Sequence, residues 1–268
     1  MVSLLVNGGD VTATRTTPQF LRVPNIEIYN AWIVRFRWLV LLLSKPLSIL
    51  PRFIQRLVPF PPVPADEIDG FNGLAQMERI PRPRVLKSHL PYSLFPPQAL
   101  RKKCKIVYIA RNPKDVVVSY RHNMKIMPAL FNYSGPWDTF YRTFVSGKLC
   151  YGDWFDHVTG WWKHKDDSNI LFLKYEDFIK DQRETVRKIA RFLDVQTTDD
   201  AEDKILEHCS FQSMKINPAV NSKMLEGGQF IRKGVIGDWE NYFTVAQNRE
   251  FEKLYAERME GTDLDFEW

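Results

Sequence analysis

The residues best suited to chemistry lie in one short stretch, from Lys105 to Arg121. Arg111 follows the apolar run Ile106–Ala110, which is typical of an inner strand of a parallel sheet. Asn112 then fits an N-cap and Pro113 the first residue of a helix. Because anions often bind where a parallel strand ends and a helix begins, this arrangement favours a phosphate site.

The hydroxyl of Ser119 belongs to the same predicted helix. It lies two turns in, on the face that also carries Asn112 and Asp115, so it can contribute to the same site. A second interpretation explains these residues equally well: Arg111 pairs with Asp115, and Ser119 is a surface hydroxyl. The sequence of this stretch is compatible with both.

A lysine and a histidine form a second candidate group. The segment Arg84–His89 is predicted to be a strand that stops before Pro91, and Lys87 and His89 project from the same face of such a strand. A histidine beside a lysine fits a general base next to an anion. A histidine satisfied by local hydrogen bonds is the alternative.

A basic pair near the C-terminus forms a third group. Arg232 and Lys233 precede Gly234 and Gly237, so that cations and bare backbone N–H groups can converge on one phosphate. A simple charged turn would have the same spacing.

The elements that must position these groups alternate between strand and helix. The run Asn169–Lys174 is a second buried-strand candidate, and Gln182–Leu193 has the apolar spacing of a covering helix. Aromatic residues from Phe131 to Trp162 have helical spacing, which predicts mostly core and some candidates for an apolar acceptor pocket. The pattern predicts an α/β fold, in which helices flank a central, mainly parallel sheet.

Length and composition favour one globular domain over residues 1–268, since 44% of the residues are hydrophobic and 26% are charged. The net charge of +5 suits an anionic ligand, although scattered lysines would give the same total. Three cysteines without a C-x-x-C pair indicate a reducing compartment and no zinc site. We expect no metal and no nucleic-acid partner.

The segment 28–66 is unusually basic and rich in proline. None of its uncharged runs approaches the roughly 20 residues needed to cross a bilayer. We interpret it as an atypical insertion within the domain. A weaker alternative is peripheral association with an anionic membrane surface.

The motifs together resemble the cytosolic sulfotransferases in order and spacing, over roughly Gly70 to the C-terminus. The residues that carry the resemblance are Lys87-Ser88-His89-Leu90-Pro91, Arg111-Asn112-Pro113-Lys114-Asp115 with Ser119-Tyr120, Tyr175-Glu176-Asp177, and Arg232-Lys233-Gly234 with Gly237-Asp238-Trp239.

The resemblance implies a cytoplasmic enzyme that moves a sulfuryl group from 3′-phosphoadenosine-5′-phosphosulfate (PAPS) to a hydroxyl or amine of a small acceptor, such as a phenol or steroid. By resemblance, His89 is the general base and Lys87 stabilises charge at the transferred group. The implied cofactor-binding residues are Arg111, Ser119, Arg232, Lys233 and Gly234 for the 3′-phosphate, with Tyr175 and Cys209-Ser210-Phe211 near the nucleotide base. Phe131 and Trp137 are implied on the acceptor side.

The sequence departs from the family in its first residues. The family's Tyr-Pro-Lys-Ser-Gly-Thr-Thr-Trp loop, which holds the 5′-phosphosulfate, is not in this chain, and Ser3–Asp10 resembles the end of the helix that follows the loop. We therefore expect a fold that lacks its first strand and this loop. Loss of preorganised charge-stabilising donors slows catalysis, so an inactive form that binds nucleotide or dimerises is the alternative function.

A second departure concerns the family's short dimer motif, which is a lysine, Thr-Val four and five residues later, and a glutamate nine residues later. Here Glu240, Thr244, Val245 and Arg249 occupy those places, so the two charges are exchanged. Exchange preserves attraction between two copies of this chain across a two-fold axis. It disfavours pairing with a chain that carries the usual signs. We expect a homodimer.

Overall fold

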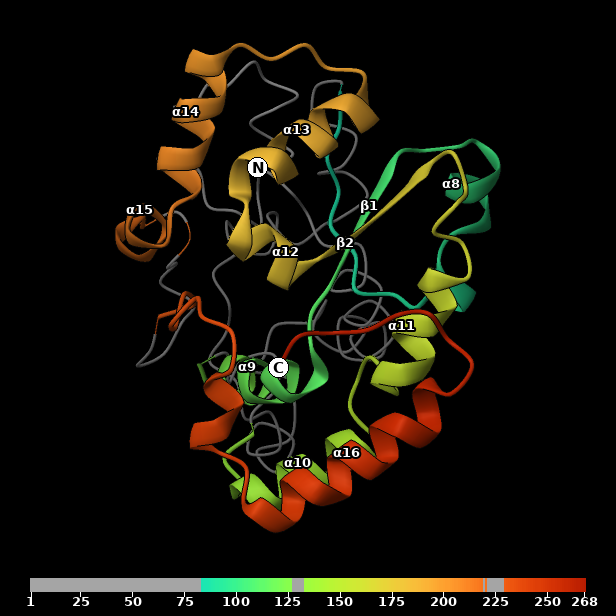
Figure 1. Cartoon of the computed structure of the whole chain (residues 1–268), viewed down its shortest axis with the longest axis vertical. Coiled ribbons are helices and arrows are strands. Elements are labelled where there is room, and N and C mark those ends of the chain that lie inside the picture. The colour runs from blue at the N-terminus through green and yellow to red at the C-terminus, as the bar shows by residue number, and fades with distance from the viewer. Residues whose placement is uncertain (1–82, 127–132, 219, 221–228) are drawn as a thin grey trace, which may run out of the picture. The chain divides into compact units, whose positions relative to one another are not determined.

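The computed structural model describes residues 83–126, 133–218, 220 and 229–268 (Figure 1). The chain divides into two compact units, one of Met1–Thr12 with Leu90–Trp268 and one of Ala13–His89. The first residues, the segment 28–66 and Phe131, all named above, lie outside the described residues.

All helices and strands discussed below belong to the unit that contains Leu90–Trp268. In chain order they are η2 (Tyr92–Leu94), α8 (Pro97–Arg101), β1 (Ile106–Ala110), α9 (Pro113–Ile126), α10 (Trp137–Val145), α11 (Trp154–Trp162), β2 (Ile170–Lys174), α12 (Tyr175–Lys180), α13 (Gln182–Leu193), α14 (Asp199–Cys209), α15 (Phe211–Ile216), η3 (Asp238–Asn241) and α16 (Val245–Met259).

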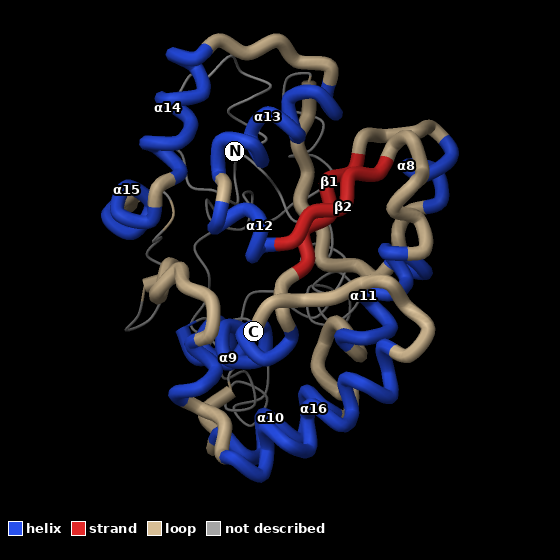
Figure 2. The backbone as a smooth tube through the Cα atoms, in the orientation of Figure 1, coloured by secondary structure: helices blue, strands red, loops and turns tan. Residues whose placement is uncertain are grey.

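The two strands pair in parallel, as the sequence predicts. Ile106 lies opposite Ile170, and the register continues to Ala110 opposite Lys174 (Figure 2). The carboxyl ends of β1 and β2 therefore meet at one edge. Arg111 and Tyr175, the residues that follow, are brought side by side.

Each face of this strand pair packs against a hydrophobic core, as its continuously apolar sequences predict, and Ile109 is the one exposed strand residue. Tyr108 and Phe172 pack against a core that includes Phe140 and Phe251. Strand residues that alternate with these pack against a second core, which contains Val186, Ile189 and Ile205 of α13 and α14. In Figure 1, α9, α10 and α16 lie on one side of the strands and α13 and α14 on the other.

The helix boundaries follow local capping chemistry. The Asn112 side chain accepts a hydrogen bond from the Asp115 amide at 2.8 Å, so the predicted N-cap of α9 is confirmed. Thr244 and Gln247 form a reciprocal capping box at the start of α16. Helix α13 spans the predicted Gln182–Leu193.

The predicted strand over Arg84–His89 is wrong. This stretch is irregular except for a single bridge residue, Lys87. Pro83 and Pro91 flank it, and proline cannot donate a ladder hydrogen bond.

In the described part of the chain, no helix has the length and apolar composition of a membrane span.

Candidate functional site

Arg111 stands at the junction of the two strand ends. Its guanidinium carbon lies 4.4 Å from the centroid of the Tyr175 ring. Its Nη2 donates to Asp115 Oδ2 at 3.0 Å and to the Val235 carbonyl at 2.6 Å. Its Nε is buried without a hydrogen-bond partner. The ion pair with Asp115 is thus present, and it leaves Arg111 with an unused donor.

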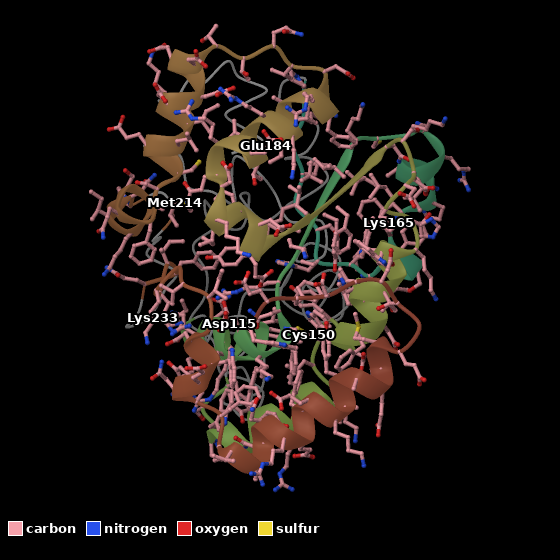
Figure 3. The ribbon with its side chains drawn as sticks, in the orientation of Figure 1. Asp115, Cys150, Lys165, Glu184, Met214 and Lys233 are labelled. Carbon is pink, nitrogen blue, oxygen red and sulfur yellow. The ribbon has the colours of Figure 1, made fainter. Side chains whose placement is uncertain are left out.

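Asp115 joins the start of α9 to the loop that carries the basic pair. Its carboxylate is fully buried and accepts from the side chains of Arg111 and, at 3.1 Å, Asn112. It also accepts from the backbone amides of Gly237 at 2.9 Å and Trp239 at 3.1 Å. Figure 3 labels Asp115 on α9 and Lys233 on the loop. One buried carboxylate therefore connects two segments more than a hundred residues apart.

The loop that carries Arg232 and Lys233 runs along one face of α9. The Nε2 atom of His122 lies 2.8 Å from the Gln229 carbonyl oxygen, while Asp115 binds the far end of the loop. Ser119 is half-buried and lies between Asp115 and His122 on that helix face. By helix geometry Ser119 therefore belongs to the face of α9 that the loop follows.

The two cations of the loop share one acceptor. Arg232 Nη1 and, at 2.6 Å, Lys233 Nζ donate to the carboxylate of Asp238, and Asn241 donates to it at 2.9 Å. Burial opposes ionisation of Asp238, but the bonds from Lys233, Arg232 and Asn241 outweigh it and hold the pKa of this carboxyl below its ordinary value. Asp238 therefore holds both cations near the start of α9.

Phe211 packs on the bare backbone of Gly234. Gly234 has φ +69°, and a Cβ there would lie 2.5 Å from Phe211 Cδ2. Ser210 is the N-cap of α15 and accepts from the Ser213 amide at 3.2 Å, while Cys209 is the last residue of α14. The structure therefore brings Phe211 to the same loop as Arg232 and Lys233.

Glu176 is a buried carboxyl that binds the Asn112 cap of α9. Its Oε1 accepts from the backbone and side-chain nitrogens of Asn112 at 2.8 and 3.1 Å, and its Oε2 is buried without a partner. Burial raises the pKa of this carboxyl, although the bonds from Asn112 act in the opposite direction.

Lys87 and His89 belong to the other compact unit, Ala13–His89. Within it, Lys87 is half-buried and His89 is exposed. Their catalytic roles stay predictions.

Trp137 has neighbours in the C-terminal part of the fold. Its Nε1 donates to Gln247 Oε1 at 3.1 Å, and its ring packs on Phe243 at 5.5 Å. Arg121 lies over it at 5.9 Å and is two residues from Ser119 on α9, so the two side chains leave the helix roughly 200° apart. A role for Trp137 at the acceptor stays a prediction.

The residues of the expected dimer motif lie at the surface. Glu240, Thr244, Val245 and Arg249 are all at least partly exposed, and 71% of Val245 is accessible.

Among the described residues, no group of three or more histidine, cysteine, aspartate or glutamate side chains is placed to hold a metal ion.

Comparison with known proteins decides the family. The chain matches the sulfotransferase domain over residues 1–263. It belongs to the sulfotransferase family. The resemblance in the motifs, the α/β fold and the enzymatic class are confirmed, and sulfuryl transfer is the chemistry of this sulfotransferase.

Two curated relatives illustrate the similarity. Sulfotransferase 1B1 of dog is 46% identical over 202 residues, which cover 73% of this chain and 68% of that protein. Bovine sulfotransferase 1A1 is 34% identical over 275 aligned residues, which cover all of this chain and 80% of that protein.

Two solved structures are similar in fold. Mouse sulfotransferase SULT7A1, complexed with PAP, matches with a TM-score of 0.65 and 39% identity over 73% of this chain and 71% of that one. Retinol dehydratase, in complex with androsterone and the inactive cofactor PAP, matches with a TM-score of 0.79 and 28% identity over 99% of this chain and 77% of that one.

No pattern in the sequence indicates a role for Lys114, Asp238 or Trp239 beyond the motifs that contain them. Each is buried. Lys114 and Trp239 bind residues that are distant in sequence, and Asp238 binds the cations of its own loop. A single buried charge in the first turn of a helix does not produce a periodic pattern in the sequence. Only the position of Lys114, three residues after Arg111, could have drawn attention to it.

Proposed function

We propose that this sulfotransferase uses PAPS as sulfuryl donor and holds its 3′-phosphate between the start of α9 and the loop 232–234. The observation that carries the proposal is the Asp115 junction, through which Arg111 and the loop of Arg232 and Lys233 form one bonded network. Cations that keep spare donors, beside a glycine without a side chain, suit a phosphate dianion.

The nucleotide base is proposed to lie between Tyr175 and Phe211. Tyr175 contacts Arg111, and Phe211 contacts Gly234, so each ring borders one half of the phosphate network. Cys209 ends α14, and Ser210 caps α15, which begins at Phe211. The PAP complexes of SULT7A1 and retinol dehydratase support the choice of nucleotide.

The chemical step is proposed to use His89 and Lys87. His89 takes the proton of the acceptor hydroxyl or amine as that atom attacks sulfur. A bond from the acceptor to sulfur forms, the bond from sulfur to the 5′-phosphate oxygen breaks, and PAP leaves with the electron pair. Lys87 stabilises the charge that develops at the transferred group.

The acceptor is proposed to be a small molecule that carries a hydroxyl or amine on an apolar body, such as a phenol or steroid. The androsterone and retinol complexes of retinol dehydratase support an apolar acceptor. Phe131 and Trp137 remain the proposed acceptor-side residues. We propose a cytoplasmic location, which the cysteine usage supports.

Calorimetric titration with PAP tests the nucleotide site. Arg111→Ala is expected to weaken binding by about 100-fold, because charge-assisted bonds to phosphate are lost. Arg121→Ala is the matched control, since Arg121 is also on α9 and its described contacts are with Gly135 and Trp137. Equal affinity of the Arg111 variant and the parent would overturn the proposed phosphate site.

Turnover tests the proposed base separately. His89→Ala is expected to retain PAP binding and to lose about 10²- to 10⁴-fold in transfer rate. Unchanged transfer by this variant would refute the role of His89. PAP binding by a parent protein that transfers no sulfuryl group to any acceptor of a phenol and steroid panel would indicate a binding module.

A homodimer through the surface segment Glu240–Arg249 is also proposed. Glu240→Lys is expected to weaken self-association in sedimentation experiments, because the new ammonium would then face Arg249 of the second copy. The double exchange Glu240→Lys with Arg249→Glu should restore it. A single variant that associates as tightly as the parent would contradict this interface.

A further inference from the structure

Two adjacent residues of opposite charge meet the same tryptophan from two sides. Lys114 and Asp115 are both 0% exposed. Asp115 Oδ1 accepts from the backbone N–H of Trp239 at 3.1 Å. The Lys114 ammonium lies 4.1 Å from the centroid of the Trp239 ring. The backbone and the side chain of Trp239 are thus held by neighbouring residues of one helix turn.

Lys114 is itself fixed by partners on α16 and near the C-terminus. Its Nζ donates to Asn248 Oδ1 at 2.6 Å and to Glu252 Oε1 at 3.0 Å, and it lies 4.3 Å from the Trp268 ring centroid. The bond from Lys114 holds the pKa of Glu252 below its ordinary value. A buried ammonium with these partners has little freedom to move.

The clamped tryptophan directly follows Asp238. Asp115 binds the amide before Asp238, that of Gly237, and the amide after it, that of Trp239. Asp238 in turn binds both Arg232 and Lys233. The position of the basic pair relative to Arg111 is therefore transmitted through Trp239 and its two clamping residues.

We propose that Lys114 and Asp115 form a clamp on Trp239 that positions Arg232 and Lys233 for an anionic phosphate. Both are positioning residues, since each is fully buried and acts on the loop's cations through Trp239 and Asp238. The proposal rests on the phosphate site proposed above. Its physical basis is preorganisation: a site whose cations are already in place loses less free energy in ordering when the anion binds.

The experiment compares three variants in the full chain. Asp115→Asn removes the negative charge of the side chain that accepts hydrogen bonds from both loop amides. Lys114→Met removes the ammonium while keeping a flexible chain between the indoles of Trp239 and Trp268. Glu176→Gln is the control, because Glu176 is also a buried carboxyl bound to Asn112 and has no described contact with the loop. Each is measured by calorimetry with PAP and by hydrogen exchange of the peptide segment 229–243.

We expect PAP affinity to fall by about 10- to 100-fold in Asp115→Asn and by about 3- to 10-fold in Lys114→Met, but by less than about 2-fold in Glu176→Gln. Exchange of segment 229–243 should accelerate in the first two variants and not in the control. Unchanged exchange and affinity in Lys114→Met, which is expected to fold even where Asp115→Asn does not, would overturn the clamp.

The two proposals fail in different ways. A folded parent protein that does not bind PAP would refute the phosphate site, whatever the variants do. Hydrogen exchange still decides the clamp in that case: faster exchange at 229–243 in both variants supports it, and exchange equal to that of the parent rejects it.

Discussion

Two regions that meet the same strand are stabilised in contrasting ways. The charged junction consists of Arg111, Asp115 and the loop 232–239, and its buried carboxylates each accept several hydrogen bonds. The aromatic layer surrounds Trp161, whose ring lies 5.1 Å from Tyr108 and 5.2 Å from Tyr92. The polar contact of this ring is one hydrogen bond, from Nε1 to the Leu90 carbonyl at 3.1 Å.

The contrast separates stability from function. Burial of aromatic area is non-directional, so the layer depends on volume. The junction depends on direction, because the loss of one charged partner leaves the others buried without compensation. The proposed ligand-binding groups belong to the junction, whereas the layer supports the strand that ends at Arg111.

The largest change is expected in the aromatic layer. Trp161→Ala should lower the free energy of unfolding by about 3–5 kcal/mol, because Trp161 is 2% exposed and its removal leaves a cavity. Denaturant titration measures this. PAP affinity of the folded fraction should change little. A loss of unfolding free energy below about 1 kcal/mol, or a selective loss of PAP binding, would contradict the contrast between the layer and the junction.

A smaller loss of stability is expected when the junction loses a carboxylate. Asp238→Ala should cost about 2–3 kcal/mol, since Arg232 and Lys233 lose their common acceptor and both are only partly buried. Here PAP affinity should fall together with stability. If the Asp238 variant unfolds at the parent's urea concentration, the pairing contributes nothing measurable.

The pH dependence should separate two buried carboxyls by sign. The folded pKa of Asp238 is lowered, so its stabilisation is present above the unfolded pKa of about 3.9 and is lost as the pH falls through the folded value. The folded pKa of Glu176 is raised, so the parent should lose stability relative to Glu176→Gln as the pH rises through that value.

Urea midpoints of the parent, Asp238→Asn and Glu176→Gln between about pH 3 and pH 8 test these signs. The stability advantage of the parent over Asp238→Asn should shrink toward acid pH. The stability of the parent relative to Glu176→Gln should decrease toward neutral pH. Parallel curves for both variants would show that the two environments do not differ.

The smallest effect distinguishes two neighbouring tryptophans. Trp161→Phe loses the bond to Leu90 inside the layer and should cost about 1–2 kcal/mol. Trp162→Phe loses a surface bond to Asp263 at 2.7 Å and should cost less than about 1 kcal/mol. Equal costs in thermal unfolding would remove the distinction between buried and exposed hydrogen bonds of this helix.

Local features of the fold are predictable from the sequence. The strands β1 and β2, the span of α13 and the Asn112 cap depend on short-range patterns, and all are confirmed. The strand over Arg84–His89 was not found, because the alternation of side chains does not reveal which stretch has a neighbour to pair with.

The candidate site was predictable in its residues but not in its connections. For Arg111 the sequence allowed an ion pair or a phosphate ligand, and the structure shows the ion pair together with a spare Nε donor. For the basic pair it allowed a charged turn, and both cations indeed bind Asp238. The bond from Asp115 to the loop spans 122 residues of sequence, so no local pattern could indicate it.

The contact between Gly234 and Phe211 constrains how this protein can diverge. A methyl group at position 234 would overlap the phenyl ring, and the left-handed backbone there already disfavours any side chain. Position 234 therefore cannot gain a side chain while Phe211 keeps its ring and its place. In descendants of this chain, a larger residue at 234 should arise only after position 211 has become smaller and the loop has changed its path, so the order of substitutions is restricted as well as their identity.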